Sequence, residues 1–78
     1  MEIYNAIFKG TKGVFGHLSV NENDRFKECC FEDISIDDSL ATEKTFKHCY
    51  FENVEFSSKK HLTGVEKGNY IHPNPELN

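Results

Sequence analysis

Residues 26–36 read Phe-Lys-Glu-Cys-Cys-Phe-Glu-Asp-Ile-Ser-Ile, and residues 46–56 read Phe-Lys-His-Cys-Tyr-Phe-Glu-Asn-Val-Glu-Phe. The second stretch repeats the first at an offset of twenty residues, with the large apolar side chains in the same places. Self-similarity at a fixed period is typical of repeat architectures, in which each unit covers the apolar face of its neighbour. The repeat therefore decides the fold class.

Within each copy the apolar side chains are spaced alternately three and two residues apart, as in Phe26, Cys29, Phe31, Ile34 and Ile36. A strand steps by two and an amphipathic helix by three and four, so neither template fits. A period of five does fit, and all its positions but Ala41 hold large apolar residues: Phe26, Phe31, Ile36, Phe46, Phe51 and Phe56. A chain that turns a corner every five residues closes a square coil in twenty, and such coils stack as short parallel strands.

Residues 24–58 resemble the pentapeptide-repeat family, whose units carry a central Leu or Phe with a small residue two places before it. The matching small or apolar positions are Cys29, Ile34, Ser39, Cys49 and Val54. The resemblance implies a mainly β fold: a short right-handed quadrilateral β-solenoid of about two coils.

The pattern predicts a single domain, residues 1–78, with three parts. Residues 21–60 are the two coils. Residues 1–20 are an N-terminal cap, either a strand or hairpin or a partial coil, because residues 14–20 alternate after two glycines. Residues 61–78 are a polar extension that ends in a loose tail from His72. Residues 37–44 break the pattern and suit a helical turn or loop capped by Asp38 or Ser39, or else a regular polar face.

The charge distribution limits the class of partner. The chain has a net charge of −4, and residues 21–56 carry ten acidic and four basic side chains. This balance argues against nucleic-acid binding, which needs a basic face. We see neither a signal peptide nor an apolar run that could span a membrane. With an odd count of three cysteines, we expect a cytoplasmic protein with reduced thiols.

The candidate chemistry is sparse. Cys29, Cys30, His48 and Cys49, with His17 or His61, do not have the spacing of a zinc site. The repeat makes Cys29 and Cys49 equivalent inward positions, where Cys behaves as a small apolar residue, and it turns Cys30 outward. The glycines at 10, 13 and 16 lack the phosphate-loop pattern. We therefore expect no cofactor, no metal and no enzymatic activity, because a coil filled with Phe leaves no pocket for catalysis.

The function that remains is non-catalytic binding of a protein partner through an acidic surface or a strand edge. A small acidic chain that begins with Met is typical of phage and mobile-element products that inhibit a host protein, which would place it in the host cytoplasm. The alternative is an assembly module that forms a homodimer through an end of the solenoid. The candidate interface consists of acidic side chains and one phenylalanine: Glu28, Glu32, Asp33, Asp37, Asp38, Glu52, Glu55 and Phe56.

Two structural expectations follow. Phe26, Phe31, Phe46 and Phe51 should be buried, with Phe26 beside Phe46 and Phe31 beside Phe51. The C-terminal end of the stack, after Phe56, should be the open end, because the polar residues that follow offer little to cover it. A partner or a second copy would dock there by strand addition or by covering the Phe layer.

Overall fold

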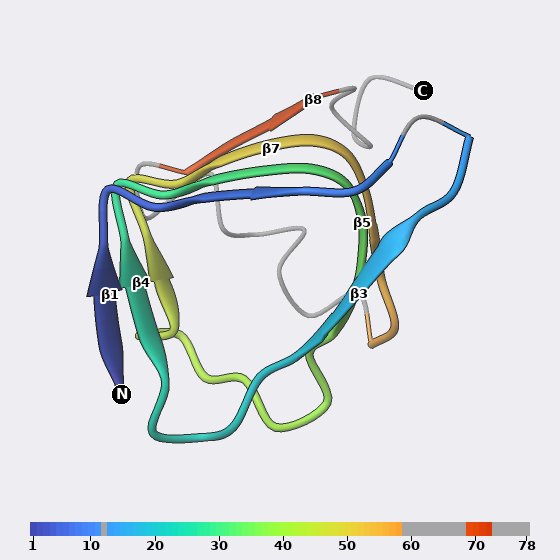
Figure 1. Ribbon diagram of the computed structural model, residues 1–78. Coiled ribbons are helices and arrows are strands. Elements are labelled where there is room, and N and C mark those ends of the chain that lie inside the picture. The colour runs from blue at the N-terminus through green and yellow to red at the C-terminus, as the bar shows by residue number, and fades with distance from the viewer. Residues whose placement is uncertain (12, 59–68, 73–78) are drawn as a thin grey trace.

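The computed structural model describes residues 1–11, 13–58 and 69–72, with only the backbone of residues 70–72 (Figure 1). This part of the chain is mainly β. It contains no helix, and so none that could span a membrane. The strands are β1 (Glu2–Tyr4), β2 (Ile7–Lys9), β3 (Gly16–Ser19), β4 (Arg25–Lys27), β5 (Cys30–Asp37), β6 (Phe46–Lys47), β7 (Tyr50–Phe56) and β8 (Tyr70–His72).

These strands form two sheets in which every pairing is parallel. One sheet has the order β1-β4-β6, and the other has the order β2-β5-β7-β8 with β3 also paired to β5. In Figure 1 the first sheet forms one side of an angular cross-section, and the long strands β5 and β7 bend to form two further sides. Short parallel strands joined by bends are what an alternating three-and-two spacing produces.

The strand register reproduces the sequence repeat. Phe26 lies opposite Phe46, and Phe31 lies opposite Phe51. Each pair is twenty positions apart, so each copy of the repeat lies directly on the other. The same offset continues into β8, where Tyr70 lies opposite Tyr50. The loose tail predicted from His72 onward is therefore wrong at that residue, which ends β8; residues 73–78 lie outside the described residues.

The N-terminal residues form a further layer of the same stack. Strands β1 and β2 pair with β4 and β5 at an offset of 23 residues, whereas β3 pairs with β5 at an offset of 18. The offset changes because a loop lies between β2 and β3. Within this loop an antiparallel bridge joins Thr11 and Val14. The strand expected within residues 14–20 is β3. Of the alternatives for residues 1–20, the hairpin is not found: β1, β2 and β3 lie parallel to the strands of the next layer, as in a partial coil.

The bends are made by residues in the left-handed backbone region. Glu28 and His48, twenty positions apart, have φ of 57° and 54°, and Asp33 and Asn53 have φ of 51° and 53°. Asn5 has the same conformation between β1 and β2. Non-glycine residues adopt this region rarely, and Asn and Asp do so most readily. Residues with this backbone conformation lie at the corners of the chain, where a strand must change direction.

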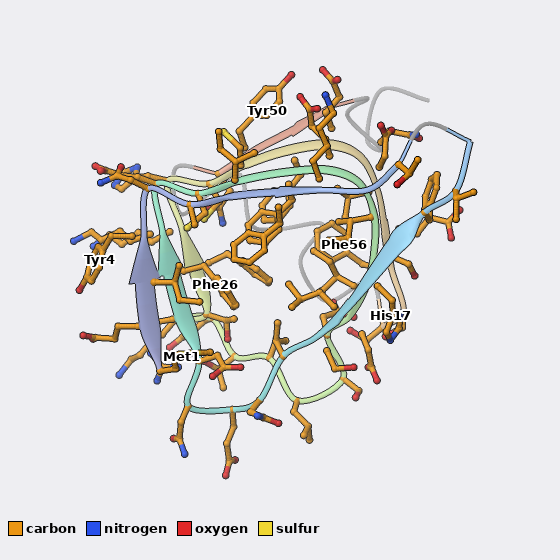
Figure 2. The ribbon with its side chains drawn as sticks, viewed as in Figure 1. Met1, Tyr4, His17, Phe26, Tyr50 and Phe56 are labelled. Atoms are coloured by element: carbon orange, nitrogen blue, oxygen red, sulfur yellow. The ribbon has the colours of Figure 1, made fainter. Side chains whose placement is uncertain are left out.

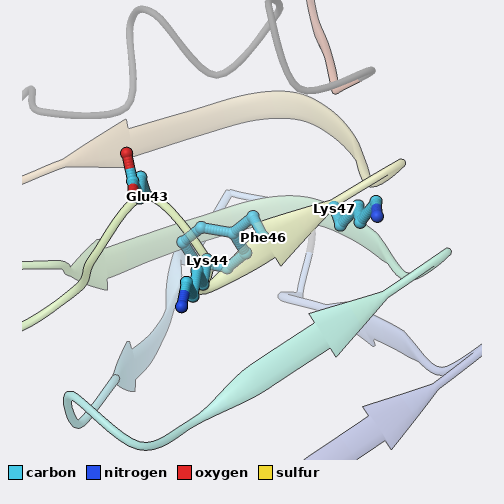
Figure 3. Close-up of a pocket in the computed structure, with 4 residues that line it drawn as sticks. All are labelled: Glu43, Lys44, Phe46 and Lys47. Carbon is cyan, nitrogen blue, oxygen red and sulfur yellow. The ribbon is translucent and has the colours of Figure 1, made fainter.

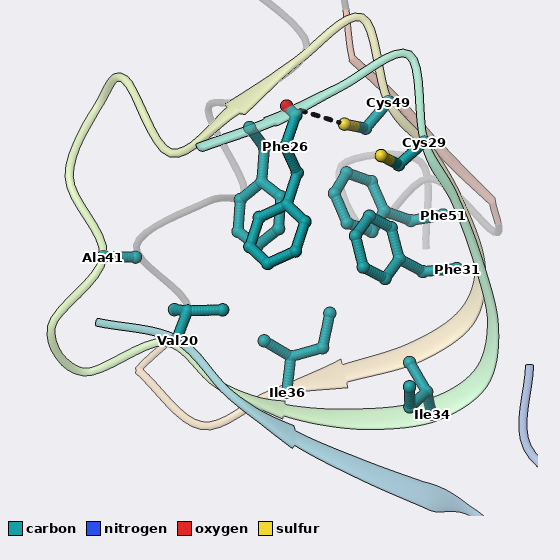
Figure 4. Close-up of a cluster of buried hydrophobic side chains, with 10 residues drawn as sticks. Val20, Phe26, Cys29, Phe31, Ile34, Ile36, Ala41, Cys49 and Phe51 are labelled. Carbon is teal, nitrogen blue, oxygen red and sulfur yellow. Dashed lines mark hydrogen bonds between the residues drawn. The ribbon is translucent and has the colours of Figure 1, made fainter. Parts of the chain in front are cut away.

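The core is a stack of phenylalanine rings (Figure 4). Phe26, Phe31, Phe46 and Phe51 are each at most 2% exposed, as predicted. The rings of Phe31 and Phe51 stack with centroids 5.0 Å apart, and those of Phe26 and Phe46 with centroids 5.4 Å apart. Phe8 extends the first column by stacking on Phe31 at 5.0 Å. Such ring pairs add about 0.5–1.5 kcal/mol each beyond the burial of their area.

Asp37 ends β5, and the turns within residues 38–44 keep the five-residue register. Ala41 is buried in the core although it is small, so the apparent gap in the repeat is still an inward position. The turn is closed by Thr45, whose backbone N–H donates to the Thr42 carbonyl at 3.1 Å and whose Oγ1 accepts from the Thr42 N–H at 2.8 Å. No helical turn forms here; the stretch is a loop of turns that still keeps the inward position of a regular face at Ala41.

Asn69 sits one repeat after Cys49 and is buried like it. Its side-chain oxygen accepts a hydrogen bond from the Cys49 backbone N–H at 2.8 Å, and its Nδ2 donates to the Phe46 carbonyl at 3.0 Å. Buried backbone groups must find partners, because leaving one unsatisfied costs about 1–3 kcal/mol. Asn69 thus satisfies two backbone groups of the layer before it.

Candidate protein-binding surfaces

The eight residues proposed as an acidic interface do not form one surface. Glu32 and Glu52 are opposite each other on the outer face of β5 and β7, and Asp33 lies at the adjacent bend, where it accepts a hydrogen bond from Asn53 Nδ2 at 2.8 Å. Glu55 and Asp37 lie farther along these strands, beyond the bend. Glu28 is exposed at a different corner. The structure therefore brings together Glu32, Asp33 and Glu52, and it places Asp37 and Asp38 at a second location, around the Ser57 hydroxyl.

Asp38 and Phe56 point into the molecule. Asp38 is fully buried, and its Oδ1 accepts hydrogen bonds from the Ser58 N–H at 2.7 Å and from Ser57 Oγ at 3.1 Å. The prediction that Asp38 belongs to an acidic surface is therefore wrong. The buried carboxylate instead links the residues after β7 to the turn after β5. Phe56 is half-buried, and its ring lies 5.2 Å from that of Phe51.

Several of the acidic side chains that remain outside have polar partners within the protein. Glu32 forms an ion pair with Lys9 at 3.4 Å, and Glu52 accepts a hydrogen bond from Tyr50 Oη at 2.7 Å. The backbone N–H of Ser39 lowers the pKa of Asp37, and the Ser39 and Ser57 side chains lower it further. These contacts offset part of the repulsion between like charges on neighbouring strands. These exposed carboxylates thus also take part in contacts within the protein.

The C-terminal end of the stack is covered in part, where we predicted an open end: β8 pairs with residues 50–52 of β7, whereas Val54 and Phe56 are only half-buried. Strand β8 pairs along β7, and Asn69 is hydrogen-bonded over the backbone between β6 and β7. Phe46 and Phe51, which were expected to lack cover, are 2% and 1% exposed. Beside β6 a hollow of about 440 Å³ remains, and Glu43, Lys44, Phe46 and Lys47 line it among the described residues (Figure 3).

The N-terminal layer, by which we mean β1, β2 and β3, is the more open end. Its inward residues Ile3, Phe8 and Leu18 are only half-buried, in contrast to the buried phenylalanines of the next layer. Ile7 is 74% exposed and Tyr4 is 56% exposed on the same layer. Val14 and Phe15, in the adjoining loop, are also exposed. Apolar side chains therefore gather at the end opposite to the one predicted.

The backbone of this layer also has a free side. The Cys30 N–H donates to the Ala6 carbonyl, and the Gly10 N–H donates to the Glu32 carbonyl. In a parallel ladder this alternation directs the N–H and C=O of Phe8 toward β5, and those of Ile7 and Lys9 outward. Among the described residues no strand pairs with this outer side of β2. Such an edge is a template for an added strand.

The sequence left a partial coil as one alternative for this layer, although the signal that favours it is present. Ile3, Ala6 and Phe8 are spaced three and two apart, as are Phe26, Cys29 and Phe31. The offset of 23 in place of twenty hides the match from a comparison at a fixed period. The loop between β2 and β3 then changes the offset again.

The cysteines lie where the repeat predicts them. Cys29 and Cys49 are buried, Cys30 is partly exposed, and all three are free thiols. The Sγ of Cys49 donates to the Phe26 carbonyl at 3.3 Å, and burial raises the pKa of the Cys49 thiol to about 11. Within the described ranges, no three His, Cys, Asp or Glu side chains are grouped so that they could hold a metal ion.

Alkylation of the native protein near pH 8 should therefore modify Cys30 first. A thiol reacts as the thiolate, and at that pH the raised pKa leaves only about one Cys49 thiol in a thousand ionised, besides its burial. We expect Cys30 to react at least about tenfold faster than Cys29 or Cys49, as read by mass spectrometry of proteolytic peptides. In urea the three rates should converge. Equal rates in the native protein would contradict the burial of the two inward thiols.

Comparison with known proteins finds no matching family model, no similar curated protein and no similar solved structure.

Proposed function

We propose that this chain is a non-catalytic protein-binding module built as a short right-handed quadrilateral β-solenoid of the pentapeptide-repeat type. Three features support this architecture: the five-residue apolar period, the twenty-residue parallel register, and the left-handed backbone at corners twenty residues apart. A solenoid has two ends, and its end layers must be capped or must meet a partner. The proposed function therefore concerns the ends of the stack.

The binding site of this module is the N-terminal layer, and its mode is strand addition along β2. The observation that carries this proposal is the coincidence of an outward-facing backbone edge with the exposed Ile7 side chain and the half-buried Phe8 ring. A partner strand gains backbone hydrogen bonds from such an edge and covers the apolar layer at the same time. The acidic side chains elsewhere on the surface contribute through long-range attraction to a basic partner.

The biological setting that we propose is inhibition of a host protein in the cytoplasm by a small protein from a phage or mobile element. The partner in that case is a host enzyme or regulator that offers an edge strand. The second candidate is an assembly module, in which the same layer of a second copy provides the strand. The exposed apolar end favours both, because a two-fold pairing would cover the layer in each copy.

Substituting Ile7 with Asp should abolish binding and leave folding intact. The Ile7 side chain is exposed, so its replacement should change the free energy of unfolding by only about 0.5 kcal/mol. A carboxylate beside the edge opposes strand addition, because the partner would have to bury it. Affinity capture from the source cell should show the loss of the retained partner, and sedimentation velocity should show the loss of any dimer.

Leu40→Asp is the matched control, because Leu40 is 56% exposed but lies in the turn between β5 and β6, which is not part of β1, β2 or β3. It should bind as the unsubstituted protein does. Retention of a host protein that Ile7→Asp loses supports the binding module, whereas concentration-dependent dimerisation without such a protein supports assembly. Equal loss of binding in both variants would overturn the assignment to the N-terminal layer.

A further inference from the structure

The four basic side chains of residues 21–56 all lie on or beside one sheet. Lys27 and Lys47 are directly opposite each other on β4 and β6, and both are exposed. Arg25 lies on β4, and Lys44 lies two residues before Phe46. All four border one shallow hollow of about 180 Å³, together with Tyr4 and Glu2 of β1. We call these four side chains the basic face; Tyr4 marks its position in Figure 2.

The positive charges of this face are not neutralised within the described part of the chain. Lys27, Lys44 and Lys47 form no ion pair there, although the protein carries an excess of carboxylates. The Arg25 guanidinium donates instead to the backbone carbonyls of Glu22 and Asp24, at 2.9 Å and 2.8 Å. Like charges directly opposite each other on neighbouring strands are destabilising. The repulsion between Lys27 and Lys47 would be relieved by an anionic ligand.

We infer that the basic face binds a short acidic segment of a protein partner. The face is two strands wide, and Glu2 and Glu43 line the hollows at its margins. An extended polyanion such as a nucleic acid would run past these carboxylates and onto a protein of net charge −4, where it is repelled. A short run of Asp or Glu places its charges over the lysines alone. The basic side chains lie on the β1-β4-β6 sheet, whereas the edge proposed for strand addition belongs to β2 in the other sheet, so the two proposals can fail separately.

Titration of the ¹⁵N-labelled protein with a short oligoglutamate peptide at low salt tests the inference. The backbone amide signals of Tyr4, Lys27 and Lys47 should shift and saturate, and added salt should weaken the binding. Lys47→Gln should weaken binding by about fivefold or more, because it removes one of the two lysines that lie directly opposite each other on this face. Lys9→Gln carries the same change of charge, but Lys9 is paired with Glu32 on the other sheet. It should weaken binding by less than about twofold, the long-range effect of one charge.

The same spectra show that each variant is folded, so a lost interaction cannot be confused with unfolding. A single-stranded oligonucleotide of similar charge should bind more weakly than the peptide. Binding of the oligonucleotide as tightly as the peptide would overturn the choice of an acidic protein segment. Equal effects of Lys9→Gln and Lys47→Gln, or no saturable shift at all, would overturn the assignment of the face. Signals that shift on simple dilution would show that the occupant is a second copy, which also contradicts it.

Discussion

Phe31→Ala should unfold this protein at room temperature. Phe31 is fully buried, and its ring contacts those of Phe8, Phe26, Phe46 and Phe51 at centroid distances of 5.0–5.6 Å. Removing such a ring from a core costs about 3–5 kcal/mol, through lost burial and the cavity left behind. A single core in a domain of this size rarely supplies more than about 3–5 kcal/mol in total. One substitution therefore removes most or all of the stability.

Far-UV circular dichroism and urea titration measure this effect. Phe15→Ala is the matched control, because Phe15 is 39% exposed in the loop between β2 and β3. Its replacement should cost about 1 kcal/mol or less, as expected for a partly exposed site. A folded Phe31→Ala protein that loses no more stability than Phe15→Ala would contradict the central place of the Phe31 ring in the core.

Gly10→Ala should destabilise the fold by about 2–4 kcal/mol, because no side chain fits at this position. A Cβ on Gly10 would clash with the Asp33 carbonyl oxygen and would lie 2.7 Å from the Gly16 backbone nitrogen. Both obstacles are backbone atoms, which cannot rotate away as a side chain can. The chain would have to shift, and the hydrogen bond from the Gly10 N–H to the Glu32 carbonyl, 2.9 Å long, would be strained or lost.

Gly16→Ala separates this effect from the general cost of replacing a glycine. The nearest atom to a Cβ there is Cγ1 of Ile34 at 3.3 Å, and this side chain can adjust. Thermal unfolding should show a clearly larger loss for Gly10→Ala than for Gly16→Ala. Similar unfolding temperatures for the two variants would show that β2 and the bend of β5 are less closely packed than described.

The architecture of residues 26–56 could be predicted from the sequence, because the pairing depends on local periodicity. Large side chains repeating at intervals of five and twenty leave few ways to bury them all, and the observed parallel register places Phe26 on Phe46 and Phe31 on Phe51. The same argument placed Cys29 and Cys49 inside and Cys30 outside. Even the exception, Ala41, kept its inward position.

The candidate site could not be predicted in the same way. Asp38 looks like its neighbour Asp37 in the sequence, but only Asp38 is fully buried, where it binds Ser58 twenty residues away. Composition also predicted an acidic middle without a basic surface, since residues 21–56 carry a charge of −6. The fold nevertheless gathers all four of their basic side chains on one side. The net charge does not reveal where the charges lie, because their separation depends on which side of the molecule each position faces.

The sequence by itself determined the mainly β fold, the register of the repeats and the identity of the core, because apolar periodicity is a local property that burial must satisfy. Only the tertiary structure decided which end of the stack is open. Residues 1–9 join the stack at an offset of 23, and β8 and Asn69 cover part of the opposite end. Cover at an end depends on hydrogen bonds between segments far apart in the chain, both those of strand pairing and those from the Asn69 side chain to the backbone. A comparison of the sequence at a fixed period of twenty does not reveal which segments make these bonds.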